Sequence, residues 1–208
     1  MVQRLLSNMI YKNKNLKLAI IGLGYVGLPL AIELSKKFKV KGYDHDITRI
    51  NDLNLGKDKN LQYKTNQFIK LKNLNFTNNF LDLAISKVFI ITVPTPIDKN
   101  KKPDLTLIIN ASNLISSVIK KNSIVILEST VYPGVTRNIV GKIIEKKSKL
   151  KLYKDFNLAY SPERINPGDK KNNLINIRKI LGASDKKTLM RVSKIYNSFL
   201  KKNIYLTD

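Results

Sequence analysis

The sequence predicts an α/β domain built on a doubly wound parallel sheet, and three observations support this prediction. Short apolar runs rich in β-branched residues alternate with segments of helical periodicity, which is the order expected of strands and crossover helices. Two of the runs, 88–93 and 124–127, are almost continuously apolar, as is typical of strands buried on both faces. A glycine-rich turn, residues 22–27, joins the first run to the first helical segment.

The elements can be placed in order along the chain. Strands are expected at residues 17–21, 40–43, 74–77, 88–93, 124–127, 156–160, 178–181 and 204–206. Helices are expected at residues 28–34, 46–53, 104–120, 136–148 and 185–200, where apolar residues recur every three or four positions. Asp104 is expected to cap the third helix, and the polar stretch 54–80 to form loops, one poor helix and the short strand 74–77. Because no Gly/Ser-rich linker divides the chain, residues 16–208 are expected to form one domain after an extension, residues 1–15.

The glycine turn and the acidic residue after the second strand predict a Rossmann-like dinucleotide site. Gly22 allows a tight turn, Gly24 lets the backbone approach a pyrophosphate, and Gly27 lets the helix pack closely on the sheet. The pyrophosphate would lie at the helix N-terminus, where unpaired N–H groups favour an anion. Asp44 lies 22 positions after Gly22, where its carboxylate can accept hydrogen bonds from a ribose 2′-OH, so NAD is favoured over NADP. The alternative is a tight strand–helix turn without a ligand.

The net charge of +23 raises the question of a nucleic-acid partner, and the residue types argue against one. Of 38 basic residues only six are arginine, so lysine supplies 32 (38 − 6). Arginine is the residue preferred for bidentate recognition of bases and phosphates. We therefore expect a solvated lysine-rich surface and no specific nucleic-acid partner, with a nonspecific polyanion contact as the alternative. The charge would still steer anionic ligands towards the protein.

Several absences from the sequence limit the function further. The chain contains no cysteine, which excludes disulfides, zinc–thiolate sites and a cysteine nucleophile within it. No metal-ligand cluster is recognisable. No apolar run approaches the ~20 residues that span a bilayer, and residues 1–15 have no apolar core of signal-peptide length. We therefore expect no membrane association and a cytoplasmic location.

Chemically useful residues follow several strands directly. In a doubly wound sheet, ligands bind beyond the carboxyl ends of the strands, near the point where the strand order reverses. The segments expected to converge there are 22–27, 94–96, 128–130 and 161–164.

Within these segments, Thr95 and Thr130 would place hydroxyls beside the nicotinamide. The alternative is that each caps a turn or a helix. Glu163 is the best candidate for a general base, because a carboxylate at the mouth of a dry crevice can be tuned towards a neutral pKa. Its alternative role is a salt bridge with Arg164, which otherwise suits a substrate diphosphate or carboxylate.

Two residues near the second strand are less decisive. Arg49 could reach the adenosine half of a cofactor or could be a solvated helix charge, and His45 is expected at the surface. One rival enzyme class is excluded, because short-chain dehydrogenases use a Tyr-x-x-x-Lys pair and none of the nine tyrosines has a lysine four positions later.

Four motifs, in matching order, resemble those of the UDP-glucose/GDP-mannose dehydrogenase family. They are GLGYVGLPLA (22–31), VPTP (93–96), ESTVYPG (128–134) and SPERINPGD (161–169). The last two look most like the branch that oxidises UDP-N-acetylglucosamine or UDP-N-acetylgalactosamine to the uronic acid for surface polysaccharide synthesis. The plain UDP-glucose enzymes tend to carry Phe-Leu-Arg-Glu after the Pro-Glu pair, where this chain has Arg-Ile-Asn-Pro (164–167).

The resemblance implies a four-electron oxidation of a sugar C6 alcohol to a carboxylate, using two NAD in succession. By analogy, Glu163 would activate the hydrolytic water and would be catalytic together with Thr130. Arg164 and Ile165 would line the sugar-nucleotide site with Glu163. The residues expected to bind NAD are Gly22, Gly24, Tyr25, Val26, Gly27, Asp44, Arg49, Thr95 and Thr130.

The chain also departs from the family pattern. Family members continue into a central helix, which supplies a catalytic lysine and asparagine and the dimer interface. A further domain then supplies the cysteine that carries a covalent adduct. We therefore expect this chain to be the NAD-binding portion, inactive alone, whose partner is the missing part or a second copy. The alternative is a stand-alone, non-catalytic NAD-binding module.

Overall fold

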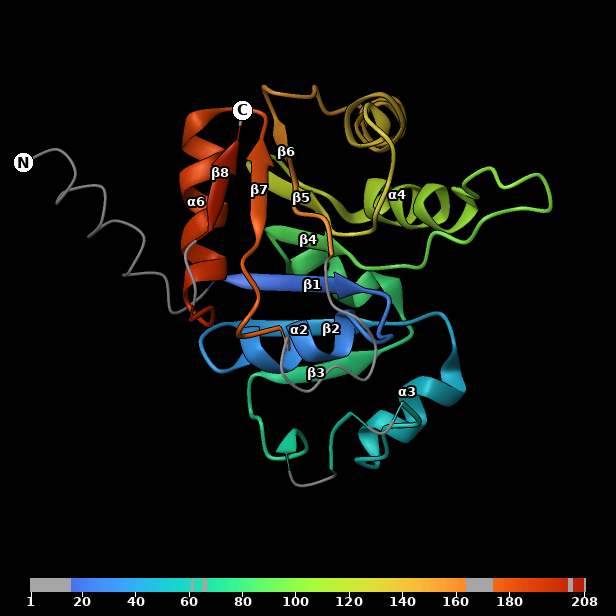
Figure 1. Cartoon of the computed structure of the whole chain (residues 1–208), viewed down its shortest axis with the longest axis vertical. Coiled ribbons are helices and arrows are strands. Elements are labelled where there is room, and N and C mark those ends of the chain that lie inside the picture. Colours follow the sequence, from blue (N-terminus) through green and yellow to red (C-terminus); the bar gives the residue numbers. More distant parts are fainter. Residues whose placement is uncertain (1–15, 61, 65–66, 164–173, 202–203, 208) are drawn as a thin grey trace, which may run out of the picture.

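The computed structural model describes residues 16–60, 62–64, 67–163, 174–201 and 204–207, so the expected extension, residues 1–15, lies outside the described residues. The chain folds around one eight-stranded sheet with the order β3-β2-β1-β4-β5-β6-β7-β8 (Figure 1). The strands are β1 (Lys17–Ile21), β2 (Lys39–Tyr43), β3 (Leu74–Thr77), β4 (Val88–Ile91), β5 (Ser123–Leu127), β6 (Phe156–Tyr160), β7 (Ile180–Ala183) and β8 (Tyr205–Thr207).

Helices cover both faces of the sheet, which confirms the doubly wound prediction. On one face, Leu18 and Ile20 of β1 pack in a core with α2 (Gly27–Ser35), α3 (Ile47–Asn54) and α6 (Lys186–Asn197). On the other face, Ala19 and Ile21 pack in a second core. That core contains side chains from the 3₁₀ helix η2 (Phe80–Ile85), α4 (Thr106–Val118), the π-helical turn η3 (Val135–Gly141) and α5 (Lys142–Ser148).

The strand order reverses between β1 and β4. From β1 the chain builds outward through β2 to β3, then returns to place β4 against the other side of β1 and continues through β5 to β6. All pairings from β3 to β6 are parallel. The connections that follow β1 and β4 therefore lead to opposite faces of the sheet, to α2 and α4, and such a reversal is where these sheets bind ligands.

The all-parallel prediction is wrong at β7, which pairs antiparallel with β6 through Ala159↔Ala183 and Tyr160↔Gly182. The strand also begins two residues later than the predicted 178–181. An apolar run has the same pattern in either direction, so the pairing direction is set by tertiary contacts. As a result, the start of β7 lies at the edge of the sheet where the parallel strands end.

Helix boundaries differ in smaller ways. The helix predicted at 104–120 begins at Thr106 after Leu105, and the Asp104 carboxylate accepts a hydrogen bond from the Thr106 N–H at 2.8 Å without being the capping residue. The helix predicted at 136–148 opens with the π-helical turn η3 before α5 begins. A 3₁₀ helix, η2, also follows β3. These ends depend on side-chain contacts that periodicity does not report.

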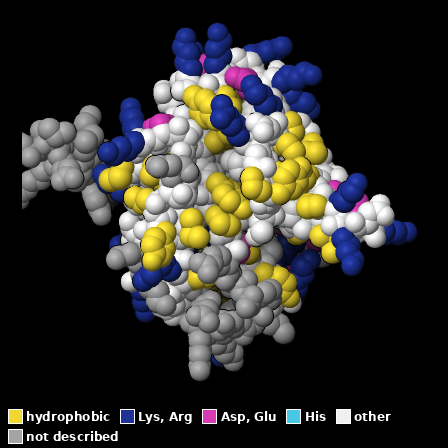
Figure 2. All heavy atoms as spheres, turned by 45° about the horizontal axis from the view of Figure 1, so that its top comes forward, with side chains coloured by type: hydrophobic (Ala, Val, Ile, Leu, Met, Phe, Trp, Pro, Cys, Tyr) yellow, Lys and Arg dark blue, Asp and Glu magenta, His cyan; other side chains and the backbone are white. Residues whose placement is uncertain are grey.

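The lysine-rich surface matches the composition. On the face shown in Figure 2, the described Lys and Arg side chains lie mainly around the rim, with hydrophobic and uncharged surface between them. Among the described helices, none has the length and apolar character needed to cross a membrane.

The glycine turn is the tightest packing point of the fold. Gly22 has a φ of +95°, a conformation that favours glycine. A Cβ at Gly27 would lie 1.8 Å from the Gly22 carbonyl oxygen. The Thr92 hydroxyl, just beyond β4, donates towards that same oxygen at 2.8 Å. The turn therefore joins β1, β4 and the start of α2, and it leaves no room for a further carbon atom at Gly27.

Gly27→Ala should lower the free energy of unfolding by about 2 kcal/mol or more, because overpacking a rigid site forces the backbone to move. Gly24→Ala is the matched control, since no atom lies within 4 Å of the position its Cβ would take. Urea denaturation of both variants measures the difference. Equal unfolding free energies for the two variants would contradict this account of the turn.

Candidate cofactor site and its catalytic edge

A pocket of about 1130 Å³ opens beyond the carboxyl ends of β1, β2, β4, β5 and β6. Gly27 lies behind the pocket, buried at the start of α2. Arg164 and Ile165 lie outside the described residues, so their predicted role stays a prediction. The predicted site residues that line the pocket are Gly22, Gly24, Tyr25, Val26, Asp44, Arg49, Thr95, Thr130 and Glu163.

Asp44 is fixed against the glycine turn. Its Oδ2 accepts a hydrogen bond from the Leu23 N–H at 2.8 Å, and its Oδ1 accepts one from the Asp46 N–H at 3.1 Å. A carboxylate offers about four acceptor positions, so Asp44 keeps capacity for ribose hydroxyls. The neighbouring His45 is exposed, as expected, with its Nδ1 3.3 Å from Asp44 Oδ1.

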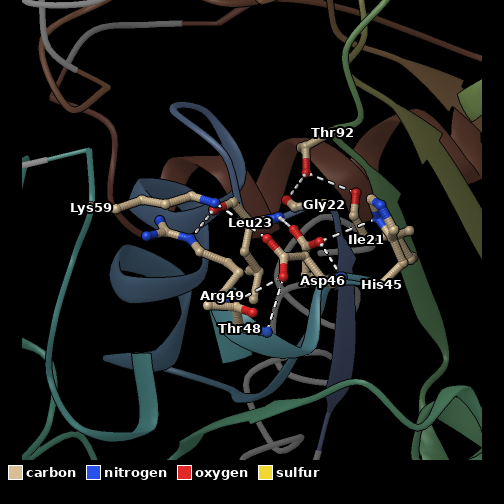
Figure 3. Close-up of polar contacts among 10 residues, drawn as sticks. Ile21, Gly22, Leu23, His45, Asp46, Thr48, Arg49, Lys59 and Thr92 are labelled. Carbon is tan, nitrogen blue, oxygen red and sulfur yellow. Dashed lines mark hydrogen bonds and ion pairs between the residues drawn. The ribbon is translucent and has the colours of Figure 1, made fainter. Parts of the chain in front are cut away.

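Arg49 is buried, so the alternative of a solvated helix charge is wrong. Its Nε donates to the Leu23 carbonyl oxygen at 3.1 Å (Figure 3). Its Nη1 lies 2.9 Å from Asp58 Oδ1. Within the described part of the chain, its Nη2 is buried without a hydrogen-bond partner. A buried donor of this kind at the border of a pocket suits an oxygen of a ligand.

Asp58 connects the buried Arg49 to a segment that borders the pocket. Its carboxylate accepts hydrogen bonds from the backbone N–H groups of Asn60, Gln62 and Tyr63. The Gln62 amide in turn donates to the Tyr25 carbonyl oxygen at 3.3 Å. One buried ion pair therefore orders the segment that borders the glycine turn.

The turn itself is open where a pyrophosphate would lie. A Cβ on Gly24 would meet no atom within 4 Å, and the first turn of α2 carries no acidic residue. A helix N-terminus with free approach along the backbone favours an anion. Together with Asp44 and the unpaired Arg49 donor, these residues fit a dinucleotide.

The two threonines lie at the other end of the pocket. Thr95 is half-buried and Thr130 is exposed, and both border the pocket. Neither is a helix cap, because Leu105 precedes α4 and Gly134 precedes η3. Both residues therefore border the pocket, and their predicted contact with a nicotinamide stays a prediction.

Glu163 lies beside a second carboxylate that the sequence analysis did not assign to the site. The Glu163 N–H donates to the Glu128 carbonyl oxygen at 3.0 Å, and both residues border the pocket. Lys179 Nζ lies 2.5 Å from Glu128 Oε2 and 3.6 Å from Glu163 Oε2. Glu163 thus forms a salt bridge, as the alternative role required, and Lys179 is a partner in it. The predicted partner, Arg164, lies outside the described residues.

Burial raises the pKa values of two side chains in this cluster, Glu128 and Tyr196. Burial raises the pKa of the Glu128 carboxyl above its usual 4.5, against the pull of Lys179. Burial, helped by the Glu128 charge, also raises the pKa of Tyr196 well above 10, so its hydroxyl remains neutral and donates to Glu128. Two signals in the sequence could have identified this cluster: an acid directly after the apolar run of β5, and a lysine within the strand predicted at 178–181.

Metal chemistry finds no support in the part of the chain that the structure describes. There, no group of three or more His, Cys, Asp or Glu side chains could hold a metal ion.

Comparisons with known proteins give a consistent picture. The sequence profile of the UDP-glucose/GDP-mannose dehydrogenase family, NAD binding domain, matches residues 16–200. UDP-N-acetyl-D-glucosamine 6-dehydrogenase of Pseudomonas aeruginosa is 46% identical over 187 residues, which cover 90% of this chain and 44% of that protein. The protein of the same name from Salmonella typhi is 42% identical, covering 92% of this chain and 45% of its own length.

A solved structure agrees with these sequences. The UDP-D-ManNAc dehydrogenase of Pyrococcus horikoshii superposes with a TM-score of 0.84 at 33% identity, covering 93% of this chain and 47% of that one. The chain thus spans just under half the length of the curated relatives it matches.

The free energy of unfolding should respond to pH through Glu128. Because burial raises the pKa of native Glu128 above 4.5, the native state keeps this proton at pH values where the unfolded chain has lost it. The contribution of Glu128 to the free energy of unfolding is therefore fully present below pH 4.5, and it is lost as the pH rises through the pKa of native Glu128. Urea denaturation from pH 4.5 upwards should show a loss of stability that Glu128→Gln reduces. An identical pH dependence in the variant would contradict this assignment.

Proposed function

The chain belongs to the UDP-glucose/GDP-mannose dehydrogenase family as its NAD-binding domain, and from this premise we propose that it forms the NAD-binding part of a UDP-N-acetylhexosamine 6-dehydrogenase. The proposed reaction oxidises the C6 alcohol of the sugar to a carboxylate in two steps, each of which passes a hydride to NAD. The choice of sugar is supported by the 46% identity to the Pseudomonas aeruginosa enzyme and by the motif at 161–169.

The observation that carries the proposal is one pocket that joins cofactor-type residues to a carboxylate. Gly24, Asp44 and Arg49 border one end, and Thr130 and Glu163 border the other. Two distant parts of the chain, one after β1 and β2 and one after β5 and β6, therefore meet at a single site. A dinucleotide bound along this pocket would extend from the Asp44 end to the Glu163 end.

Each residue has a role set by its position. Bound NAD supplies the hydride acceptor. Asp44 orients a ribose through its hydroxyls, and the N-terminus of α2 holds the pyrophosphate. Thr95 and Thr130 hold the nicotinamide half. Glu163 removes a proton from the water that releases the acid, which is general-base catalysis by a carboxylate near the reacting atoms.

The remaining chemistry is proposed to come from sequence outside this chain. The chain contains no cysteine, whereas the family resemblance implies a thiol that carries the sugar as a thioester before hydrolysis. The matched relatives are more than twice as long as the matched region. We therefore assign the thiol to the half of the enzyme that this chain does not cover.

NAD should bind this chain at least ten-fold more tightly than NADP. A 2′-phosphate would face the Asp44 carboxylate, and lost or unmatched hydrogen bonds cost about 1–3 kcal/mol each. Asp44→Ala should weaken NAD binding and reduce the discrimination, whereas Asp52→Ala on α3, outside the pocket lining, should change neither. Isothermal titration calorimetry measures both affinities. Equal affinities in the unaltered chain would remove Asp44 from this role.

Catalysis should require the other half of the enzyme. The chain alone should form no NADH from UDP-N-acetylglucosamine or UDP-N-acetylgalactosamine. The first hydride transfer would lack the lysine and the second half of the substrate site that the family resemblance assigns to the missing part, and the second would lack the thiol. Adding the complementary half of the Pseudomonas aeruginosa relative in trans should restore NADH formation. Glu163→Gln should then accumulate a sugar thioester on that half, visible by mass spectrometry, because the water is no longer activated.

Glu145→Gln is the control for this experiment. Glu145 lies on α5, outside the pocket lining, and its carboxylate is 3.0 Å from the Lys142 ammonium. NADH formation by the chain alone would show that hydride transfer does not need the other half of the enzyme. NAD binding without turnover in the complemented mixture would instead favour a non-catalytic NAD-binding module.

A further inference from the structure

The floor of the pocket contains charged groups to which the proposed chemistry gives no role. The Glu128 and Lys179 side chains are 0% and 2% exposed, and Tyr196 is fully buried. The Glu163 side chain, 11% exposed, is the most exposed of the four, and Glu163 borders the pocket together with Glu128. The cluster thus connects a buried ion pair to the proposed general base.

The antiparallel strand β7 brings Lys179 to this place. The register of β6 and β7 pairs Tyr160 with Gly182, and its continuation places Glu163 opposite Lys179. In a parallel β7 the residue before the strand would lie at the opposite edge of the sheet. The Lys179 carbonyl oxygen also accepts a hydrogen bond from the Tyr205 N–H at 2.8 Å, which fixes its backbone to β8.

Lys179 is held on several sides. Its ammonium lies 2.5 Å from Glu128 Oε2 and 5.3 Å from the centre of the Tyr196 ring, a distance at which a cation is attracted to the ring face. The Tyr196 hydroxyl donates to the other oxygen of Glu128. A buried cation is tolerated only with such partners, so the position of the ammonium is fixed without any contribution from Glu163.

The same ammonium serves two carboxylates. With Glu128 and Glu163 both ionised, the cluster carries one excess negative charge, which is unfavourable at a buried site. A proton on either carboxyl removes the excess. When Glu163 takes a proton from water, its carboxyl becomes neutral and no longer repels the Glu128 carboxylate. The Lys179 ammonium then pairs with Glu128 alone.

We propose that Lys179 is a positioning residue for Glu163: its ammonium, anchored by Glu128 and Tyr196, holds the Glu163 carboxylate at the pocket floor and couples the protonation of the two glutamates. The importance of this contact for catalysis rests on the proposed function of Glu163. The contact and the coupling can be tested in this chain without substrate.

The test uses the small number of glutamates in the chain. There are four, Glu33, Glu128, Glu145 and Glu163, so ¹³C labelling at the glutamate side-chain carboxyl gives four NMR signals. Replacement of each glutamate by glutamine assigns them. Titration then follows Glu163 and Glu128 separately, and coupling should appear as two-step curves in both signals.

Lys179→Met should move the titration midpoint of Glu163 upwards, because a cation 3.6 Å from its carboxylate is lost. Lys179→Arg should restore the original midpoint. Lys142→Met is the matched control: it removes an exposed ammonium 3.0 Å from Glu145, and it should leave the Glu163 signal unchanged.

Glu128→Gln gives an independent arm if Lys179→Met fails to fold. In this variant Glu163 is, among the described residues, the one ionisable carboxyl beside the Lys179 ammonium. Its titration midpoint should therefore move downwards, and its titration should become single-step. An unchanged Glu163 titration in Glu128→Gln and in any folded Lys179→Met protein would overturn the proposal.

The complemented enzyme separates this proposal from the proposed function. Lys179→Met should lower kcat with little change in the KM for NAD, and Lys179→Arg should recover kcat. A shifted Glu163 titration with unchanged kcat would support the positioning role and argue against Glu163 as the general base. An unshifted titration would contradict the positioning role whatever the activity.

Discussion

The close approach of α2 to the end of β1 is the constraint on which the cofactor half of the pocket depends. A side chain at Gly27 would occupy the position of the Gly22 carbonyl oxygen, so the helix can begin here only with glycine. The compact turn then presents Leu23, whose N–H bonds to Asp44 and whose carbonyl oxygen bonds to Arg49. Because Asp44, after β2, and Arg49, on α3, both bond to this residue, their side chains take their positions from the turn.

The other half of the pocket depends on a buried charge. Lys179 contacts two carboxylates from the ends of β5 and β6, and the desolvation of these ions is offset only by their mutual attraction and by hydrogen bonds. Such a cluster is a poor source of stability compared with an apolar core. Its presence at the pocket floor, beside the residue that opens to the ligand, is consistent with a role in the chemistry of Glu163.

The two halves meet because the strand order reverses between β1 and β4. The loops after these strands diverge there and leave room for a ligand, while the Thr92 and Ser129 hydroxyls tie the strand ends together through the Gly22 and Val93 carbonyl oxygens. The chain therefore offers a pre-formed cofactor site and a positioned carboxylate. In the proposed enzyme the other half of the protein adds the thiol.

The sequence by itself determined the fold class, the glycine turn and the acid at Asp44, because periodicity and glycine spacing are local consequences of backbone geometry. It also predicted that Glu163 lies near the carboxyl edge of the sheet, because this residue follows the strand 156–160 closely. Only the tertiary structure decided the direction of β7, the burial of Arg49 against Asp58, and the joining of Lys179 to Glu128 and Tyr196. These depend on pairings between residues up to 68 positions apart, and no local pattern records which distant residue a strand or a charge will meet.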